Sequence, residues 1–113
     1  MRIIKGKVRP RTRPVPGTMN KHEEKYAAYL ELRKRTGEII DYRFERLKFK
    51  LADKTFYTPD FIVVTPEMFE LHEVKGFWED DARIKIKVAA EEYPYFQFIA
   101  VQWKEKQWKF EEF

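Results

Sequence analysis

Several residue types are missing from this 113-residue chain, and each absence removes a class of function. There is no cysteine, which excludes disulfides, thiolate metal sites and cysteine nucleophiles. There is no serine either, so serine hydrolases and serine recombinases are excluded. No apolar run approaches the ~20 residues of a membrane-spanning helix, and the first residues lack the apolar core of a signal peptide. We therefore expect a cytoplasmic protein without a small-molecule cofactor, in which any hydrolysis uses water, a metal ion or, as the less favoured choice, a tyrosine.

The positive charge is concentrated at the N-terminus. Residues 1–21 hold seven basic residues and no acidic one, so the rest of the chain is net negative although the whole carries +4. Prolines interrupt this segment, and alternate residues are basic at Lys5, Lys7, Arg9, Arg11 and Arg13. We predict an extended basic arm over residues 1–19 and a single domain over 20–113. The arm is interpreted either as a solubilising tail or as a segment that contacts nucleic-acid phosphates or a second subunit.

The remaining pattern predicts a mixed sheet flanked by helices. Asn20 and Glu23 have the spacing of a capping box that begins a helix ending near Arg35, and they place Glu23 on its buried side. Alternating apolar residues predict strands over 40–51 with a bend, 55–64, 69–77, 95–103 and 108–113, and a second helix over 79–92. The order indicates an α/β (α+β) fold of the αβββαβ type.

The hairpin formed by strands 55–64 and 69–77 carries the most informative side chains. With its turn centred between Pro66 and Glu67, Asp60 faces Glu73 and Lys75 lies on the same side of the sheet. Cross-strand neighbours have Cβ atoms about 4.5–5.5 Å apart, so these carboxylates repel unless a proton or a cation lies between them.

Magnesium and manganese prefer such oxygen ligands, and a lysine beside them can orient water or offset phosphate charge. Pro59 cannot donate a ladder hydrogen bond, which favours an open strand end. The alternative is an exposed Glu73–Lys75 edge with Asp60 as a cap, but it leaves the flanking apolar residues unexplained.

These residues resemble the PD-(D/E)xK nuclease superfamily, which has the restriction-endonuclease-like fold. The resemblance implies that Asp60 and Glu73 are metal ligands and that Lys75 is the catalytic lysine. Glu23 is similar to the helix acid that completes the metal site, with Glu24 as the fallback and simple capping as the alternative. It also implies the Val74 backbone carbonyl as a ligand, and one or two Mg²⁺ ions per site, for which Mn²⁺ substitutes.

The segment from Glu73 to Arg83, followed by Tyr93-Pro94, is similar to the endonuclease I type of phage Holliday-junction resolvases. The resemblance implies a phage or bacterial homodimer that cuts branched DNA with one site per subunit. The proline-rich arm and the short body depart from that type.

Other DNA structures (flaps, nicked duplex, a short duplex site) and a non-catalytic nucleic-acid-binding module stay open as alternatives. Basic residues near the second helix also predict phosphate contacts. The candidates are Arg83, Lys85 and Lys87, although a solvated helix face is as well supported for Lys85. His72 neighbours Glu73 but points to the opposite face, and we interpret it as a packed histidine and not a metal ligand.

Overall fold

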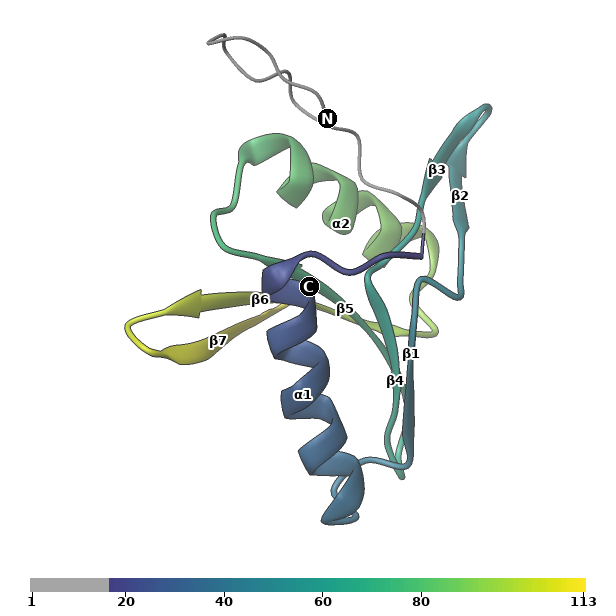
Figure 1. Cartoon of the computed structure of the whole chain (residues 1–113). Coiled ribbons are helices and arrows are strands. Elements are labelled where there is room, and N and C mark those ends of the chain that lie inside the picture. The colour runs from purple at the N-terminus through teal and green to yellow at the C-terminus, as the bar shows by residue number, and fades with distance from the viewer. Residues whose placement is uncertain (1–16) are drawn as a thin grey trace, which may run out of the picture.

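Two helices cover opposite faces of a five-stranded mixed sheet in the computed structural model, which describes residues 17–113 (Figure 1). The strand order is β1-β4-β5-β6-β7, with β5 and β6 parallel and the other neighbours antiparallel, while β2 and β3 form a separate hairpin. The elements are α1 (Lys21–Arg35), β1 (Asp41–Phe44), β2 (Phe49–Ala52), β3 (Thr55–Tyr57), β4 (Phe61–Val64), β5 (Phe69–Lys75), α2 (Asp80–Glu92), β6 (Gln97–Lys104) and β7 (Gln107–Glu112).

The first helix begins and ends where the sequence predicts. The Glu23 backbone N–H donates to the Asn20 side chain at 2.8 Å, and the Asn20 N–H donates to the Glu23 carboxylate at 2.9 Å. Two of the helix's unpaired N-terminal groups are thereby satisfied. Gly37 follows the C-terminus at φ +84°, a left-handed conformation that glycine adopts without strain.

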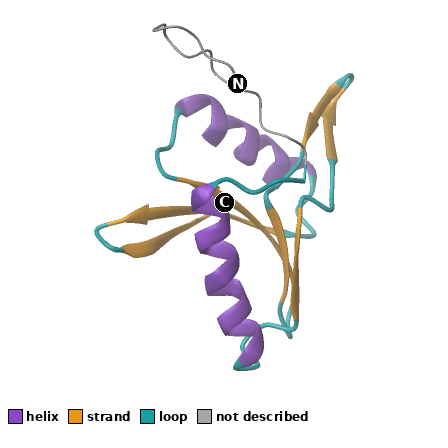
Figure 2. Ribbon diagram, in the orientation of Figure 1, coloured by secondary structure: helices purple, strands orange, loops and turns teal. Residues whose placement is uncertain are grey.

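The predicted continuous strand over residues 55–64 is wrong. It divides into β3 and β4 at Thr58-Pro59-Asp60, where proline has no N–H to continue a ladder. The expected bend after Phe44 is larger than a bulge, because β2 leaves the main sheet to pair only with β3. The two strands of this hairpin extend away from the body of the molecule (Figure 2).

The register of the central hairpin is confirmed. β4 and β5 pair as Ile62 with Leu71 and Val64 with Phe69, around a turn in which the Thr65 N–H donates to the Met68 carbonyl at 2.9 Å. Continuing this register places Asp60 opposite Glu73, just beyond the last paired residue of β4.

Each face of the sheet has its own core, and β5 contributes to both. Tyr26 and Leu30 of α1 pack on Phe61, Val63, Val74, Ile99 and Val101. On the other face, Ile86 and Ala89 of α2 pack with Leu71, Phe98 and Ala100. Because side chains alternate along a strand, Glu73 and Lys75 share the α2 face with Leu71. Between residues 17 and 113, neither helix is long and apolar enough to cross a membrane.

Candidate metal centre

Asp60 and Glu73 are both buried where β4 begins and β5 runs past it. Their exposed fractions are 7% and 9%, so Glu73 is not the exposed edge residue that the alternative interpretation of the sequence required. The Val74 N–H donates to Asp60 Oδ2 at 2.8 Å, and the Asp60 N–H donates to Glu73 Oε1 at 3.2 Å. Each carboxylate is therefore fixed by the segment that carries the other.

Burial makes the ionised form of both acids unfavourable. It raises the pKa of Asp60 to about 9, with a further contribution from the neighbouring Glu73 carboxylate. Burial also raises the pKa of Glu73, although Lys75 and a hydrogen bond from Tyr57 oppose that shift. Two such acids in contact share negative charge that the protein does not fully neutralise. A cation at this position would remove the penalty.

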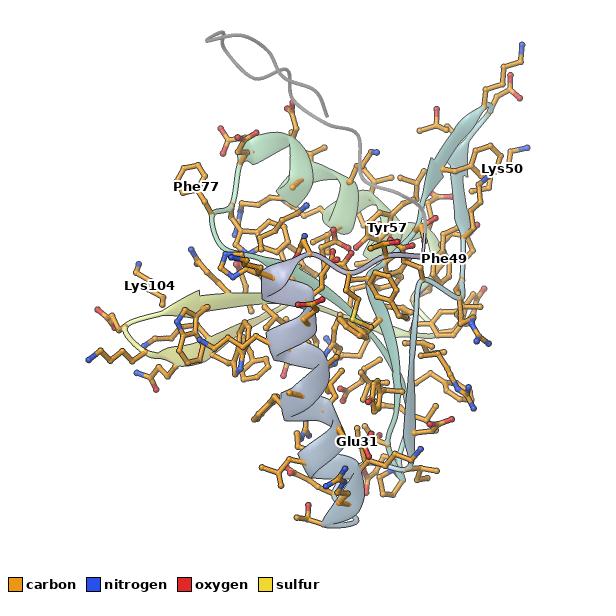
Figure 3. The ribbon with its side chains drawn as sticks, viewed as in Figure 1. Glu31, Phe49, Lys50, Tyr57, Phe77 and Lys104 are labelled. Atoms are coloured by element: carbon orange, nitrogen blue, oxygen red, sulfur yellow. The ribbon has the colours of Figure 1, made fainter. Side chains whose placement is uncertain are left out.

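Tyr57 is a site residue that the sequence analysis missed. Its hydroxyl donates to Glu73 Oε1 at 2.9 Å, and Figure 3 shows the side chain on the inner side of the β2–β3 hairpin. Burial, followed by the Glu73 charge, raises the pKa of Tyr57 above its usual range, so it remains a hydrogen-bond donor. In a continuous strand Tyr57 would face away from Asp60. The break at Pro59 turns it inward, and no alternation pattern could reveal this.

Lys75 lies beside the pair, as the hairpin register predicted. Its Nζ atom is 3.6 Å from Glu73 Oε2, and 41% of the side chain is exposed. Water screens the half-exposed Lys75 ammonium and so weakens this ion pair, although the Glu73 carboxylate is itself buried. The ammonium group is therefore available to a ligand that approaches Glu73 from solvent.

Glu23 caps its helix and also lies close to Asp60. It is 9% exposed, and one carboxylate oxygen closes the capping box with Asn20. It also lies near enough to Asp60 to contribute to the raised pKa of that acid. Glu24, the fallback, is exposed.

Two histidines lie near these acids without joining them. The His22 ring lies so close to Gly76, the residue after Lys75, that a side chain there would collide with it. His72 points to the α1 face as predicted, where it bonds the Tyr26 hydroxyl at 2.6 Å and Glu70 at 2.9 Å.

The donor set fits a hard divalent cation. The Val74 N–H bonds Asp60 Oδ2, and the Asp60 N–H and the Tyr57 O–H bond Glu73 Oε1. Asp60 Oδ1 is then open to a ligand, while Glu73 Oε2 could bind one alongside the Lys75 ammonium, 3.6 Å away. All available atoms are oxygens, the ligands that Mg²⁺ and Mn²⁺ prefer. Across the described residues, no three His, Asp or Glu side chains already converge as a metal-binding group. Glu23 is committed in part to its own helix cap, so Asp60 and Glu73 would be the main carboxylate ligands of such an ion.

The Val74 carbonyl adds a backbone oxygen. In an extended strand the N–H and C=O of one residue point to the same side, and the Val74 N–H points to Asp60. Continuing the β4–β5 register places Pro59 opposite Val74, and proline has no N–H to offer that carbonyl. The Pro59-Asp60 sequence therefore leaves the Val74 carbonyl oxygen beside the Asp60 carboxylate.

A cleft of about 520 Å³ opens onto this site from the α2 face. Glu73 and Lys75 line it from β5, together with residues of β3 and of the start of α2. These are Phe56, Tyr57, Thr58, Glu79, Asp81, Ala82 and Lys85.

The predicted phosphate-binding residues are distributed unevenly. Lys85 lines the cleft, whereas Arg83 forms a two-point ion pair with Glu111 of β7 at 2.6 Å. Lys87 borders a separate small hollow beside Phe113. The basic residues predicted for the arm, Lys5 to Arg13, lie outside the described residues.

No protein-family model, curated protein or solved structure matches this chain.

Proposed function

We propose that this protein is a metal-dependent endodeoxyribonuclease of the PD-(D/E)xK type, with the restriction-endonuclease-like core. Its proposed substrate is branched DNA, and its proposed setting is the cytoplasm of a bacterium or a phage-infected cell. The observation that carries the proposal is the buried Asp60–Glu73 pair, joined by Lys75 at the edge of an open cleft. A binding module gains nothing from two buried, partly neutralised acids, whereas a nuclease needs them to hold a cation.

The protein's own groups have distinct roles in this proposal. Asp60, Glu73 and the Val74 carbonyl would hold Mg²⁺ or Mn²⁺, with Glu23 as the additional acid from α1. A bound divalent ion supplies Lewis-acid polarisation of a phosphate and a water of lowered pKa. Tyr57 holds the Glu73 carboxylate in one orientation. Lys75 lies at the solvent side of Glu73, where it can orient the attacking water or offset charge that develops on the phosphate.

Cutting both strands of a junction needs two sites, and one chain has a single carboxylate pair in the part that the structure describes. A two-fold homodimer is therefore part of the proposal. The resemblance of the segment from Glu73 to Arg83 favours junctions over flaps, nicked duplex or a short duplex site.

The test is DNA cleavage by the full chain in Mg²⁺ and in Mn²⁺. Matched four-way junction, flap, nicked, linear and single-stranded substrates are compared, with Glu73→Gln as the site variant and the exposed turn residue Glu67→Gln as the control. We expect the junction to be cut by the wild type and by E67Q, and cutting by E73Q to fall at least 100-fold, as expected when a catalytic metal ligand is lost. If every substrate stays intact with both metals, the protein is not a nuclease. If another DNA structure is cut in preference to the junction, the protein is still a nuclease, but its substrate is not branched DNA of the junction type.

A further inference from the structure

The β2–β3 hairpin is a firmly anchored wall of the cleft, although it lies outside the main sheet. Phe49 of β2 packs edge-on against Tyr93, Phe96 and Phe98, with ring centroids 4.8, 5.5 and 5.6 Å away. The Tyr93 hydroxyl also donates to the Lys50 carbonyl at 2.6 Å. Tyr57 on β3 bonds Glu73, so the hairpin is tied directly to the carboxylate pair.

The other face of the hairpin is basic and aromatic. Phe56 pairs with Lys50 across the two strands, and the Lys48 ammonium lies 4.5 Å from the centre of the Phe56 ring. Phe56 is 43% exposed, and Figure 3 shows Lys50 projecting from the outer side of the hairpin. A single exposed aromatic residue is ordinary on protein surfaces. Phe56 differs because it has lysines beside it and lines the same cleft as Glu73 and Lys75.

The charges around the cleft also favour this wall as the path of a nucleic acid. The opposite wall, at the start of α2, presents Glu79 and Asp81, with Lys85 as the single basic residue among those that line the cleft from this helix. A phosphate backbone is repelled by that acidic wall and attracted by Lys48 and Lys50, which lie beside Phe56 on the hairpin but outside the cleft lining. Its bases would then lie next to the Phe56 ring.

We propose that Phe56, with Lys48 and Lys50, binds an unpaired DNA segment next to the scissile phosphate, with Phe56 stacking on one base. This inference deepens the proposed nuclease function and rests on it. Aromatic side chains between basic residues are the usual means of holding single strands, because every base has a face that can stack. Bases inside a duplex already stack on each other, so Phe56 discriminates in favour of DNA that is opened at a branch.

The test measures binding without cleavage, in EDTA, with the full chain. The probes are oligonucleotides that carry 2-aminopurine in an unpaired segment or in an intact duplex, because stacking on an aromatic ring changes the fluorescence of this base. Phe56→Ala is compared with Phe56→Trp, which keeps a stacking surface, and with Phe69→Ala. Phe69 is a matched control because it is 51% exposed at the other end of β5, outside the cleft lining.

We expect F56A to weaken binding of the unpaired probe roughly tenfold and to abolish the fluorescence change, as loss of one stacked base predicts. F56W and F69A should bind as the wild type does, and duplex binding should be the same for all four proteins. Equal losses in F56A and F69A, no loss in F56A, or no binding of the unpaired probe by the wild type would overturn the inference. If binding depends on Phe56 but the protein cuts no DNA, the proposed nuclease function is refuted and the proposed stacking site is retained.

Discussion

At the scale of single residues, the fold maintains a buried carboxylate pair that is unfavourable without a partner. Asp60 and Glu73 have raised pKa values because they are desolvated, and Asp60 also lies beside the Glu73 charge. Hydrogen bonds from Val74, Asp60 and Tyr57 orient the acids but do not cancel the charge. Arrangements that cost stability in this way are typical of functional sites. The free energy of unfolding of the metal-free protein should therefore depend on the ionisation of Asp60.

Asp60→Asn should stabilise the metal-free protein at about pH 8 by on the order of 1–3 kcal/mol, because it removes an uncompensated buried acid. The folded-state pKa of Asp60, about 9, is above its ordinary value of 3.8, so the native state binds the extra proton between these limits. Wild-type stability should consequently fall as pH rises from about 4 to about 9. The measurement is thermal unfolding across this range, with the exposed Asp53→Asn as control.

Added Mg²⁺ should stabilise the wild type increasingly as pH rises, since the carboxyl groups must lose their protons to bind it. D60N should not respond to the metal. A wild-type profile that rises toward pH 8 without metal, or coincides with that of D60N, would contradict this explanation of the site.

At the scale of elements, the break between β3 and β4 creates the site. With a residue other than proline at position 59, a continuous strand would pair the Val74 carbonyl with a backbone N–H and would turn Tyr57 away from Glu73. The position of the turn predicted the register of β4 and β5 correctly, because a tight turn fixes which residues face each other. Alternation of apolar residues predicted the strands themselves. It did not predict the departure of β2 and β3, because the apolar residues of this hairpin alternate in the same way when they pack against α2. The strand pairing partner is decided by tertiary contacts.

Pro59→Ala should weaken divalent-metal binding by about tenfold or more, within the range seen when groups around a metal site are changed. The new N–H competes for the Val74 carbonyl and draws the strand toward a regular ladder. Metal titration followed by calorimetry measures the effect, with the exposed turn proline in Pro66→Ala as the comparison. Unchanged affinity in P59A would show that the Val74 carbonyl does not contribute to the metal site.

At the scale of the whole molecule, the site lies at the meeting point of elements that are distant in the sequence. β5 supplies Glu73 and Lys75, the segment before β4 supplies Asp60, and the start of α1 supplies Glu23. The turn position was sufficient to predict that Asp60 and Glu73 lie opposite each other, and the capping box to predict that Glu23 begins α1, because hairpin register and helix capping are local. Arg83 was predicted as a phosphate ligand but pairs with Glu111 of β7, a contact between residues far apart in the chain. Charge alone cannot tell a free cation from a paired one.

A resolvase-like enzyme should be a dimer in solution. Sedimentation equilibrium should give about twice the 13.9 kDa mass of the chain, because paired cuts need two sites related by symmetry. Sedimentation is independent of the nuclease assay. If the protein is a monomer at the concentration at which it cuts DNA, four-way junctions are not its substrate. It would then be a nuclease that acts on another class of DNA structure.

The central claim is that the Asp60–Glu73 pair is a metal site, and a crystal structure of the protein grown with Mn²⁺ tests it most directly. Anomalous scattering should locate manganese within about 2.0–2.4 Å of oxygens from both carboxylates, the range of hard-cation ligand distances. The Val74 carbonyl should lie within the same range, and the peak should be absent from D60N crystals grown in the same way. A well-ordered wild-type site with no manganese peak, or a peak that avoids both carboxylates, would contradict the claim.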